Sequence, residues 1–239
     1  MFRSHRILAA IFTLVFTSFA ARAAEPLHVQ IDKLIAAGQT GHEKELAPAA
    51  TDAEFLRRAY LDLAGTLPSS DEVRAFLADV DAKKREKLID KLLASPGYAR
   101  RMAQHFDVVL MERRRDNRVP RAAWEDYLRA AFAENRSYDQ FAREILSADG
   151  VDPKTRPAAK FYLDRDFEPN LVTKDIARVF LGRNLQCAQC HDHPLIDAYK
   201  QSEFYGILAF LNRTYLFPNA TVPTAVLAEK PDGVPTVTV

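Results

Sequence analysis

Both cysteines of the chain lie in one short motif, Cys187-Ala-Gln-Cys190-His191. This C-x-x-C-H spacing is typical of covalent attachment of a c-type haem. The thiols of Cys187 and Cys190 can add to the two vinyl groups of one haem as thioethers, and His191 brings an imidazole to the iron as the proximal ligand. The sequence therefore predicts covalent haem c as the cofactor, held by these three residues.

The same donors allow two other interpretations. Together with His193, the motif offers enough ligands for a zinc ion, but all four donors lie within seven residues and lack the distant second pair that closes most structural zinc sites. Cys187 and Cys190 could also form a disulfide or a thiol redox pair. A thioredoxin-like pair would follow a strand, whereas the residues before this motif have a helical pattern. Zinc or a disulfide therefore stays as the alternative to haem.

The sequence does not identify a second axial ligand for the iron. Electron-transfer cytochromes often use a Met, but none follows the motif, since the three are Met1, Met102 and Met111. Met102 or His105 is the best internal candidate for the sixth ligand, although Met102 also fits a core-packing helix face. His193 is too near the motif to reach the opposite haem face easily, and we expect it to support the site or to bind a metal.

The first 23 residues have the three parts of a secretory signal peptide. Arg3 and Arg6 precede an uncharged apolar stretch, Ile7–Ala20, and Ala21 and Ala23 supply the small residues of a cleavage site. The apolar stretch is shorter than the roughly 20 residues that span a bilayer. We therefore expect residues 1–23 to be removed, and the mature chain to be periplasmic or secreted without a transmembrane segment.

The composition indicates a globular protein. Of the 239 residues, 48% are hydrophobic and 27% are charged, which excludes disordered and multi-spanning classes. The 33 Lys and Arg residues balance 32 Asp and Glu residues, so that nothing indicates nucleic-acid binding. The densest basic run, Arg113–Arg115 with Arg118 and Arg121, is either a solvated helix end or a contact for haem propionates or an acidic redox partner.

Apolar residues recur at helical spacing in segment after segment, which predicts a mainly α fold. Thr51, Ser69 and Ser95 are expected to cap the starts of helices, and Gly65 is expected to end one. We predict an orthogonal multi-helix array that carries the C-x-x-C-H segment on a loop or helix. The seven stripes are Leu56/Ala59/Tyr60/Leu63, Val73/Phe76/Leu77/Val80, Met102/Phe106/Val109/Leu110, Trp124/Tyr127/Leu128/Ala131, Tyr138/Phe141/Ala142/Ile145, Val172/Ile176/Val179/Phe180 and Phe204/Ile207/Leu208/Leu211.

Three segments follow from these patterns: the signal peptide, a helical domain over residues 24–214, and a tail over residues 215–239. Gly150, Pro153 and Pro157 mark loops and an internal boundary near residues 148–160. The tail is rich in Pro and ends in the alternating run Val234–Val239, which predicts a strand. We expect this β-prone or irregular tail to begin a further domain of a longer chain.

Three blocks of the sequence resemble a known family. They are Leu56–Pro68 (LRRAYLDLAGTLP), Ala177–Pro194 (ARVFLGRNLQCAQCHDHP) and Gln201–Gly206 (QSEFYG). They look like the planctomycete cytochrome-C-like domain of unknown function, over about residues 27–215. The resemblance implies a secreted protein, usually followed by a second uncharacterised domain, but no established reaction.

These observations predict an exported haem protein that transfers electrons with a larger partner module. The alternative from another class is a non-haem scaffold or interaction domain, in which the Cys-His cluster holds a metal or a disulfide. A third prediction, an oxidative enzyme with an open iron position, applies if the iron has no sixth ligand. Whether the protein is an enzyme is left open by the sequence.

Overall fold

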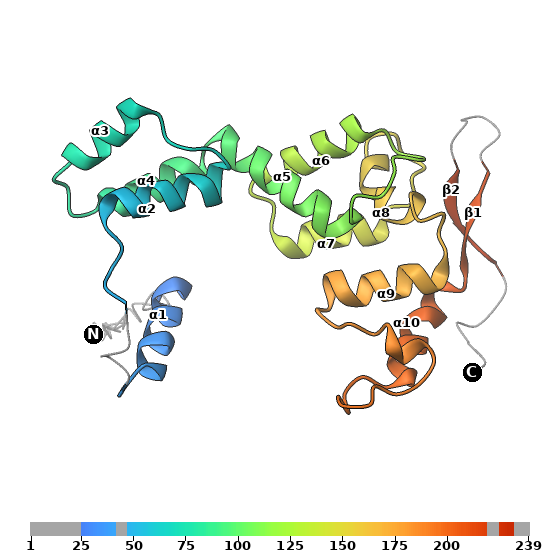
Figure 1. Cartoon of the computed structure of the whole chain (residues 1–239). Coiled ribbons are helices and arrows are strands. Elements are labelled where there is room, and N and C mark those ends of the chain that lie inside the picture. Colours follow the sequence, from blue (N-terminus) through green and yellow to red (C-terminus); the bar gives the residue numbers. More distant parts are fainter. Residues whose placement is uncertain (1–24, 42–46, 219–224, 232–239) are drawn as a thin grey trace, which may run out of the picture. The chain divides into compact units, whose positions relative to one another are not determined.

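The computed structural model describes residues 25–41, 47–218 and 225–231 (Figure 1). The chain divides into two compact units, residues 1–49 and residues 50–239. Helix α1 (Leu27–Gly38) belongs to the first unit and buries none of its residues. The predicted signal peptide and the predicted strand Val234–Val239 lie outside the described residues.

The second unit is mainly helical, which confirms the predicted fold class. Its two short strands come last in the described chain. The elements in chain order are α2 (Asp52–Ala59), the π-helical turn η2 (Tyr60–Ala64), α3 (Ser70–Ala78), α4 (Lys84–Leu93), α5 (Pro96–Met111), α6 (Arg121–Ala133), α7 (Tyr138–Ser147), the 3-10 turn η3 (Arg156–Ala159), α8 (Lys160–Leu163), α9 (Pro169–Phe180), the 3-10 turn η4 (Cys187–Gln189), α10 (Gln201–Leu211), β1 (Thr214–Phe217) and β2 (Val226–Glu229).

The predicted helix starts are confirmed. The Thr51 hydroxyl accepts a hydrogen bond from the Glu54 N–H, and Ser95 caps α5, which has Pro96 at its first position. Ser69 and Glu72 form a complete capping box at the start of α3. Gly65 ends η2 in the left-handed conformation, with φ of 71°. These caps satisfy backbone N–H groups that a helix leaves without partners.

Two local predictions are corrected by the structure. The stripe that begins at Val73 reaches only Ala78, because Asp79 is extended and accepts the Asp81 N–H on its side chain. Val80 is therefore 98% exposed. The Pro-containing segment predicted as loop contains η3, since proline is compatible with the first turn of a helix.

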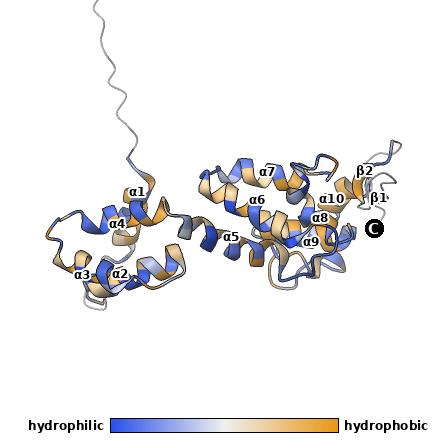
Figure 2. Cartoon of the chain, turned by 90° about the horizontal axis from the view of Figure 1, so that it is seen from above, coloured by the Kyte–Doolittle hydropathy of each residue, from blue (hydrophilic) through white to orange (hydrophobic). Residues whose placement is uncertain are grey.

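Three hydrophobic clusters hold the second unit together. Figure 2 shows hydrophilic and hydrophobic residues distributed around the helices, as expected for amphipathic helices. The first cluster lies between α2, η2, α3 and α4, and the second, which is the largest, involves α5 to α9. The third joins α9 and α10 across η4 and includes Leu185, Ala188 and Phe204. The predicted haem motif is therefore built on a small core of its own.

The described part of the tail is an antiparallel hairpin that packs on the helices. In its register Thr214 lies opposite Glu229, and Phe217 lies opposite Val226. The Leu227 N–H donates to the Asp149 carbonyl at 2.8 Å, and Val226 is buried. The backbone groups of β2 thus find partners both in β1 and in the helical body.

The predicted internal boundary near residues 148–160 also falls at a packed segment. Ala148, Ala158 and Ala159 belong to the same core cluster as residues on either side of them. The boundary, and the start of a further domain after residue 215, remain predictions.

A buried ion-pair cluster lies under the segment between α5 and α6. It consists of Lys160, Asp164, Arg165 and Asp175, each at most 5% exposed. The Lys160 ammonium contacts Asp164, and Arg165 Nε donates to Asp175 at 2.7 Å. The Asp164 carboxylate also accepts the Arg118 N–H at 2.7 Å. The cluster therefore fixes the 112–119 backbone from the inside.

Candidate functional site

The predicted haem motif lies on η4, between α9 and α10. Ala188, the second residue of the motif, is 1% exposed and packs in the third hydrophobic cluster. Cys187 and Cys190 are both free and exposed. The motif is thus anchored through Ala188, which lies between the two cysteines, while both thiols remain accessible.

Hydrogen bonds hold the backbone of the motif in place. The N–H groups of Cys190 and His191 both donate to the Cys187 carbonyl, each at 3.2 Å. From α10, the Tyr205 hydroxyl donates to the Gln189 carbonyl and Gln201 Nε2 donates to the Cys190 carbonyl, both at 3.1 Å. These hydrogen bonds give the turn a defined backbone shape.

The hydrogen bond of His191 selects one form of its ring. His191 Nδ1 lies 2.7 Å from the backbone oxygen of Asp192. Since a carbonyl oxygen only accepts, Nδ1 must carry the proton, and Nε2 of the neutral ring keeps its lone pair. This is the tautomer that a metal-ligating histidine needs, with the other nitrogen held by a backbone carbonyl.

His193 has the opposite arrangement. Its Nδ1 accepts the N–H groups of Leu195 and Ile196, at 3.2 and 3.1 Å. The neutral ring must then carry its proton on Nε2, where a metal would bind. The backbone N–H of His193 donates to the Tyr199 carbonyl at 2.9 Å. These contacts favour a structural role for His193, that of capping the loop before Tyr199.

Asp192 joins the motif to the start of α10. Its side chain accepts the Gln201 N–H at 2.7 Å and lies 3.5 Å from the Lys200 ammonium. Chiefly because of the Gln201 hydrogen bond, the pKa of the Asp192 carboxyl lies below its ordinary value. Asp192 therefore stays ionised and supports the loop whose carbonyl orients His191. The sequence had no periodic signal for this contact, because it joins two exposed loop ends.

The two proposed sixth ligands lie on α5, which packs mainly against α6 and η2. Met102 is half-buried and His105 is exposed, with its ring against Phe106. Within the described residues, no hydrogen bond, ion pair or ring contact joins either residue to the motif. Among these described residues, the structure thus shows no such contact between His191, the predicted proximal ligand, and Met102 or His105, the predicted sixth ligands.

No group of three or more His, Cys, Asp or Glu side chains is arranged to hold a metal ion in residues 25–41, 47–218 and 225–231. In the same ranges, no helix combines the length and the apolar character that crossing a bilayer requires.

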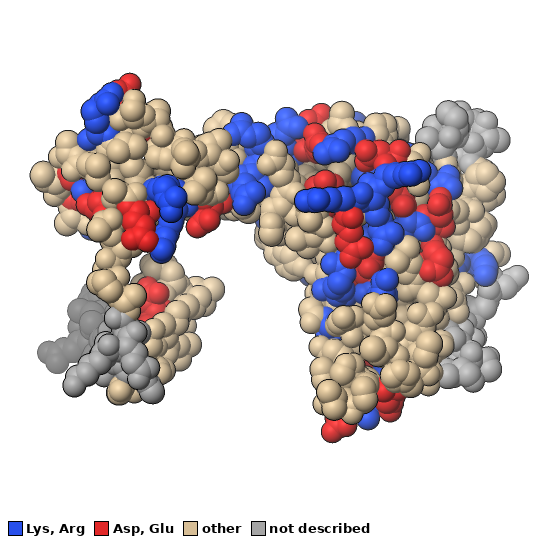
Figure 3. Space-filling view, viewed as in Figure 1, with Lys and Arg blue, Asp and Glu red and all other residues tan. Residues whose placement is uncertain are grey.

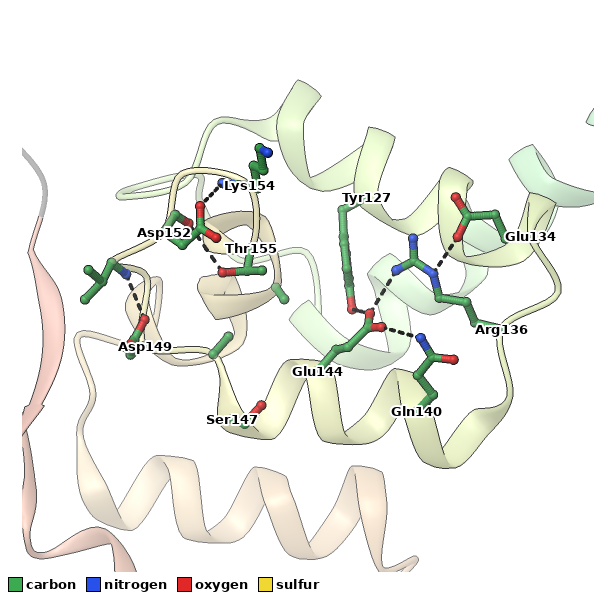
Figure 4. Close-up of a pocket in the computed structure, with 13 residues that line it drawn as sticks. Tyr127, Glu134, Arg136, Gln140, Glu144, Ser147, Asp149, Asp152, Lys154 and Thr155 are labelled. Atoms are coloured by element: carbon green, nitrogen blue, oxygen red, sulfur yellow. Dashed lines mark hydrogen bonds and ion pairs between the residues drawn. The ribbon is translucent and has the colours of Figure 1, made fainter.

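A cavity of about 730 Å³ lies elsewhere, between α6, α7 and the segment that follows α7 (Figure 4). Three donors converge there on the Glu144 carboxylate: the Tyr127 hydroxyl at 3.1 Å, Arg136 at 2.8 Å and Gln140 at 2.9 Å. Burial, above all, raises the pKa of Tyr127. Because Glu144 is already occupied by these donors, its carboxylate is poorly placed to act as a general base.

Comparison with known proteins identifies a family without an assigned function. The family model PSCyt2, described as a protein of unknown function (DUF1549), matches residues 30–215. No curated protein and no solved structure matches the chain. The match contains all three sequence blocks that carried the resemblance, including the Cys-His motif.

Proposed function

Because the chain belongs to the PSCyt2 family, a domain of unknown function, its activity must be argued from its own residues, and we propose that it is an exported c-type haem protein for electron transfer. The electrons would pass to or from a partner protein or a downstream domain. The observation that carries the proposal is the 2.7 Å contact of His191 Nδ1 with the Asp192 carbonyl, beside two exposed thiols.

The donor set of the motif fits this cofactor. Cys187 and Cys190 would hold the haem covalently, and His191 would bind its iron through Nε2. Once attached, the haem would supply one-electron redox chemistry. Gln201 and Tyr205 keep the backbone of the turn fixed, and the Asp192 carbonyl keeps the His191 proton on Nδ1. These contacts support the proposal, because they fix the backbone that carries the three side chains.

The exposure of the motif favours electron exchange over chemistry in a closed pocket. Both cysteines and His191 are exposed, so a partner can approach the group attached there. An enzyme site would instead need a cavity that excludes water around the reacting atoms. The cavities of about 730 and 600 Å³ are lined by other residues. Export would place the chain where haem c is attached.

The scaffold alternative has less support. The hydrogen bonds from α10 and the burial of Ala188 hold the loop through contacts within the chain, which leaves the Cys-His donors available for a cofactor. Two free thiols one turn apart nevertheless remain suited to a disulfide. The test must therefore distinguish haem, zinc and disulfide directly.

The test is expression with its leader in a host that matures haem c. We expect red protein that stays coloured after denaturation and has the mass of one attached haem. Cys187→Ala with Cys190→Ala should abolish covalent retention, and His191→Ala should alter the spectrum. Gln186→Ala is the matched control, because this exposed neighbour of the motif has no side-chain partner in the described structure, and it should keep normal colour.

The possible outcomes separate the alternatives. Colourless protein with stoichiometric zinc, or with a 187–190 disulfide, would reject haem attachment and support the scaffold. If haem is attached and the reduced protein binds carbon monoxide readily, the iron has an open position and an oxidative role gains support. A low-spin spectrum unaffected by carbon monoxide, but changed by Met102→Ala or His105→Ala, would identify the sixth ligand.

A further inference from the structure

A second concave site lies away from the haem motif, at the end of α5 and the start of α6. It is a groove of about 600 Å³ whose wall includes five arginines and three acidic residues. Figure 3 shows basic side chains gathered, with acidic ones among them, over the part of the molecule that contains α5 and α6. The arginine groove is defined here by Arg100, Arg113, Arg114, Arg121 and Arg129, with Asp107, Asp116 and Glu125.

All three acidic residues of the groove are engaged by partners. Asp107 accepts the indole N–H of Trp124 at 2.8 Å, and Asp116 accepts the buried Lys160 ammonium at 2.9 Å. Glu125 pairs with Arg121 at 2.6 Å. Two of the three negative charges are therefore paired with cations, Lys160 and Arg121, whereas Asp107 is hydrogen-bonded by the neutral indole of Trp124.

Two of the arginines have no such partner. Within the described residues, the side chains of Arg100 and Arg113 make no hydrogen bond and no ion pair, and both residues are exposed. They come from different elements, since Arg100 lies on α5 and Arg113 lies after it. Two unpaired guanidinium groups on one concave surface can each present a fork of N–H donors to an anion.

The backbone that carries Arg113 is strained and firmly held. Glu112 and Arg113 both adopt the left-handed conformation, with φ of 50° and 60°, which non-glycine residues seldom do. The strain is held by ion pairs of the neighbouring residues, since Glu112 pairs with Arg178 at 2.7 Å and Arg114 pairs with Asp175 at 3.4 Å. Strained backbone of this kind is concentrated at binding sites.

We propose that the arginine groove binds a compact polyanion with tetrahedral oxyanion groups, such as phosphate or sulfate. Its volume lies within the roughly 300–1,000 Å³ of small-molecule sites, which suits a ligand with two such groups better than a long polymer. Arg100 and Arg113 supply the charge-assisted hydrogen bonds. Arg114, Arg121 and Arg129 also line the groove, but each is paired with a carboxylate, so that Arg100 and Arg113 carry its unpaired positive charge.

The chain provides its own probe for the test. Trp124 is its single tryptophan, is buried, and donates to Asp107 in the wall of the groove. Binding should therefore change the tryptophan fluorescence. The full chain would be titrated with pyrophosphate, sulfate, citrate and a long sulfated polymer, with calorimetry on the same samples. We expect saturable pyrophosphate binding that weakens as salt is raised.

The variants locate the binding. Arg100→Gln with Arg113→Gln should weaken pyrophosphate binding about tenfold or more, because each lost charged hydrogen bond contributes on the order of a tenfold change. These substitutions break no side-chain hydrogen bond or ion pair of the described residues. The control is Arg57→Gln with Arg143→Gln, which removes the same charge from exposed positions outside the groove, and it should change the affinity less than twofold.

Three results would show that the arginine groove does not bind a compact anion. They are equal affinity in the groove and control variants, no heat and no fluorescence change up to millimolar pyrophosphate, or binding of the long polymer alone. Tighter binding of sulfate than of pyrophosphate would keep the site and assign it to sulfate-type ligands. Citrate binding equal to that of pyrophosphate would show that charge alone is recognised, and would reject selectivity for tetrahedral oxyanions.

Discussion

The buried ion-pair cluster and the Cys-His turn are two polar regions that the chain treats in opposite ways. In the cluster, Arg165 Nε donates to Asp175 at 2.7 Å, and its two terminal nitrogens donate to the carbonyls of Phe161 and Leu110. In the turn, the backbone is hydrogen-bonded, but the thiols of Cys187 and Cys190 are free and exposed. One region uses its polar side chains for structure, and the other keeps them available.

The difference shows where each region is vulnerable. A buried charge that loses its partner costs several kcal/mol, because neither water nor another group replaces the partner. An exposed thiol or imidazole can be removed at little cost, since water already solvates it. Substitutions in the buried ion-pair cluster should therefore lower the free energy of unfolding. Substitutions of the exposed Cys and His side chains should change what the turn can bind, with little change in stability.

Removal of the Asp175 side chain should lower the free energy of unfolding more than any other substitution considered below. Burial, above all, already lowers the pKa of Arg165, and Asp175 is the group that opposes this shift most strongly. Asp175→Ala leaves the buried guanidinium without its anion, so the free energy of unfolding should fall by about 3–5 kcal/mol. Urea unfolding monitored by circular dichroism measures the change.

Two further variants test that explanation. Asp139→Ala removes an exposed carboxylate whose ion pair with Arg143 is 3.7 Å long, and it should change stability by less than about 1 kcal/mol. Arg165→Met combined with Asp175→Leu should be less destabilised than Asp175→Ala, because it leaves no buried charge unpaired. If Asp175→Ala, Asp139→Ala and the Arg165→Met, Asp175→Leu double variant all lost the same free energy of unfolding, the explanation by an unpaired buried charge would be wrong.

Glu72 provides an intermediate case, an ionised group in a partly exposed cap. Hydrogen bonds from Tyr60 and then from Ser69 lower the pKa of its carboxyl to about 2. A carboxyl with a lowered pKa stabilises the fold above its unfolded value of 4.5, and this contribution is lost as the pH falls towards 2. Its size, with solvent screening, is that of a helix cap, about 1 kcal/mol or less.

The pH dependence therefore distinguishes the cap from the cluster. Glu72→Gln should flatten the fall in stability between about pH 4.5 and 2 relative to the unmodified chain. Unfolding free energies measured at intervals over that range give the comparison. An unchanged slope would show that these contacts do not lower the pKa of Glu72 in the folded chain.

The helical framework could be predicted from the sequence because its signals are local. Thr51, Ser69 and Ser95 cap helices through contacts within three residues, and each amphipathic stripe places apolar residues on one face. The sequence showed no comparable stripe for α4, and the helical turn η3 lies in a segment that was predicted as loop. Both segments depend on packing that a local pattern does not record.

The site could be predicted only as a set of residues. The spacing of Cys187, Cys190 and His191 is local, so it was visible in the sequence. The carbonyl that sets the tautomer of His191 and the α10 side chains that fix the turn are consequences of tertiary structure. The same holds for the arginine groove, where the 112–121 segment meets α5. The sequence showed the charges, but not which of them remain unpaired.

The smallest predicted effect concerns the turn itself. Gln201→Ala removes the side-chain hydrogen bond to the Cys190 carbonyl but keeps the Gln201 N–H bond to Asp192. Because this contact is exposed, global stability should fall by only about 0.5–1 kcal/mol. The backbone of residues 187–191 should nevertheless open more often, which amide hydrogen exchange detects as faster exchange there and not in α6. Tyr205→Phe, which loses the bond to the Gln189 carbonyl, should act in the same way. Unchanged exchange in both variants would mean that the third hydrophobic cluster, through Ala188, is sufficient to hold the turn in shape.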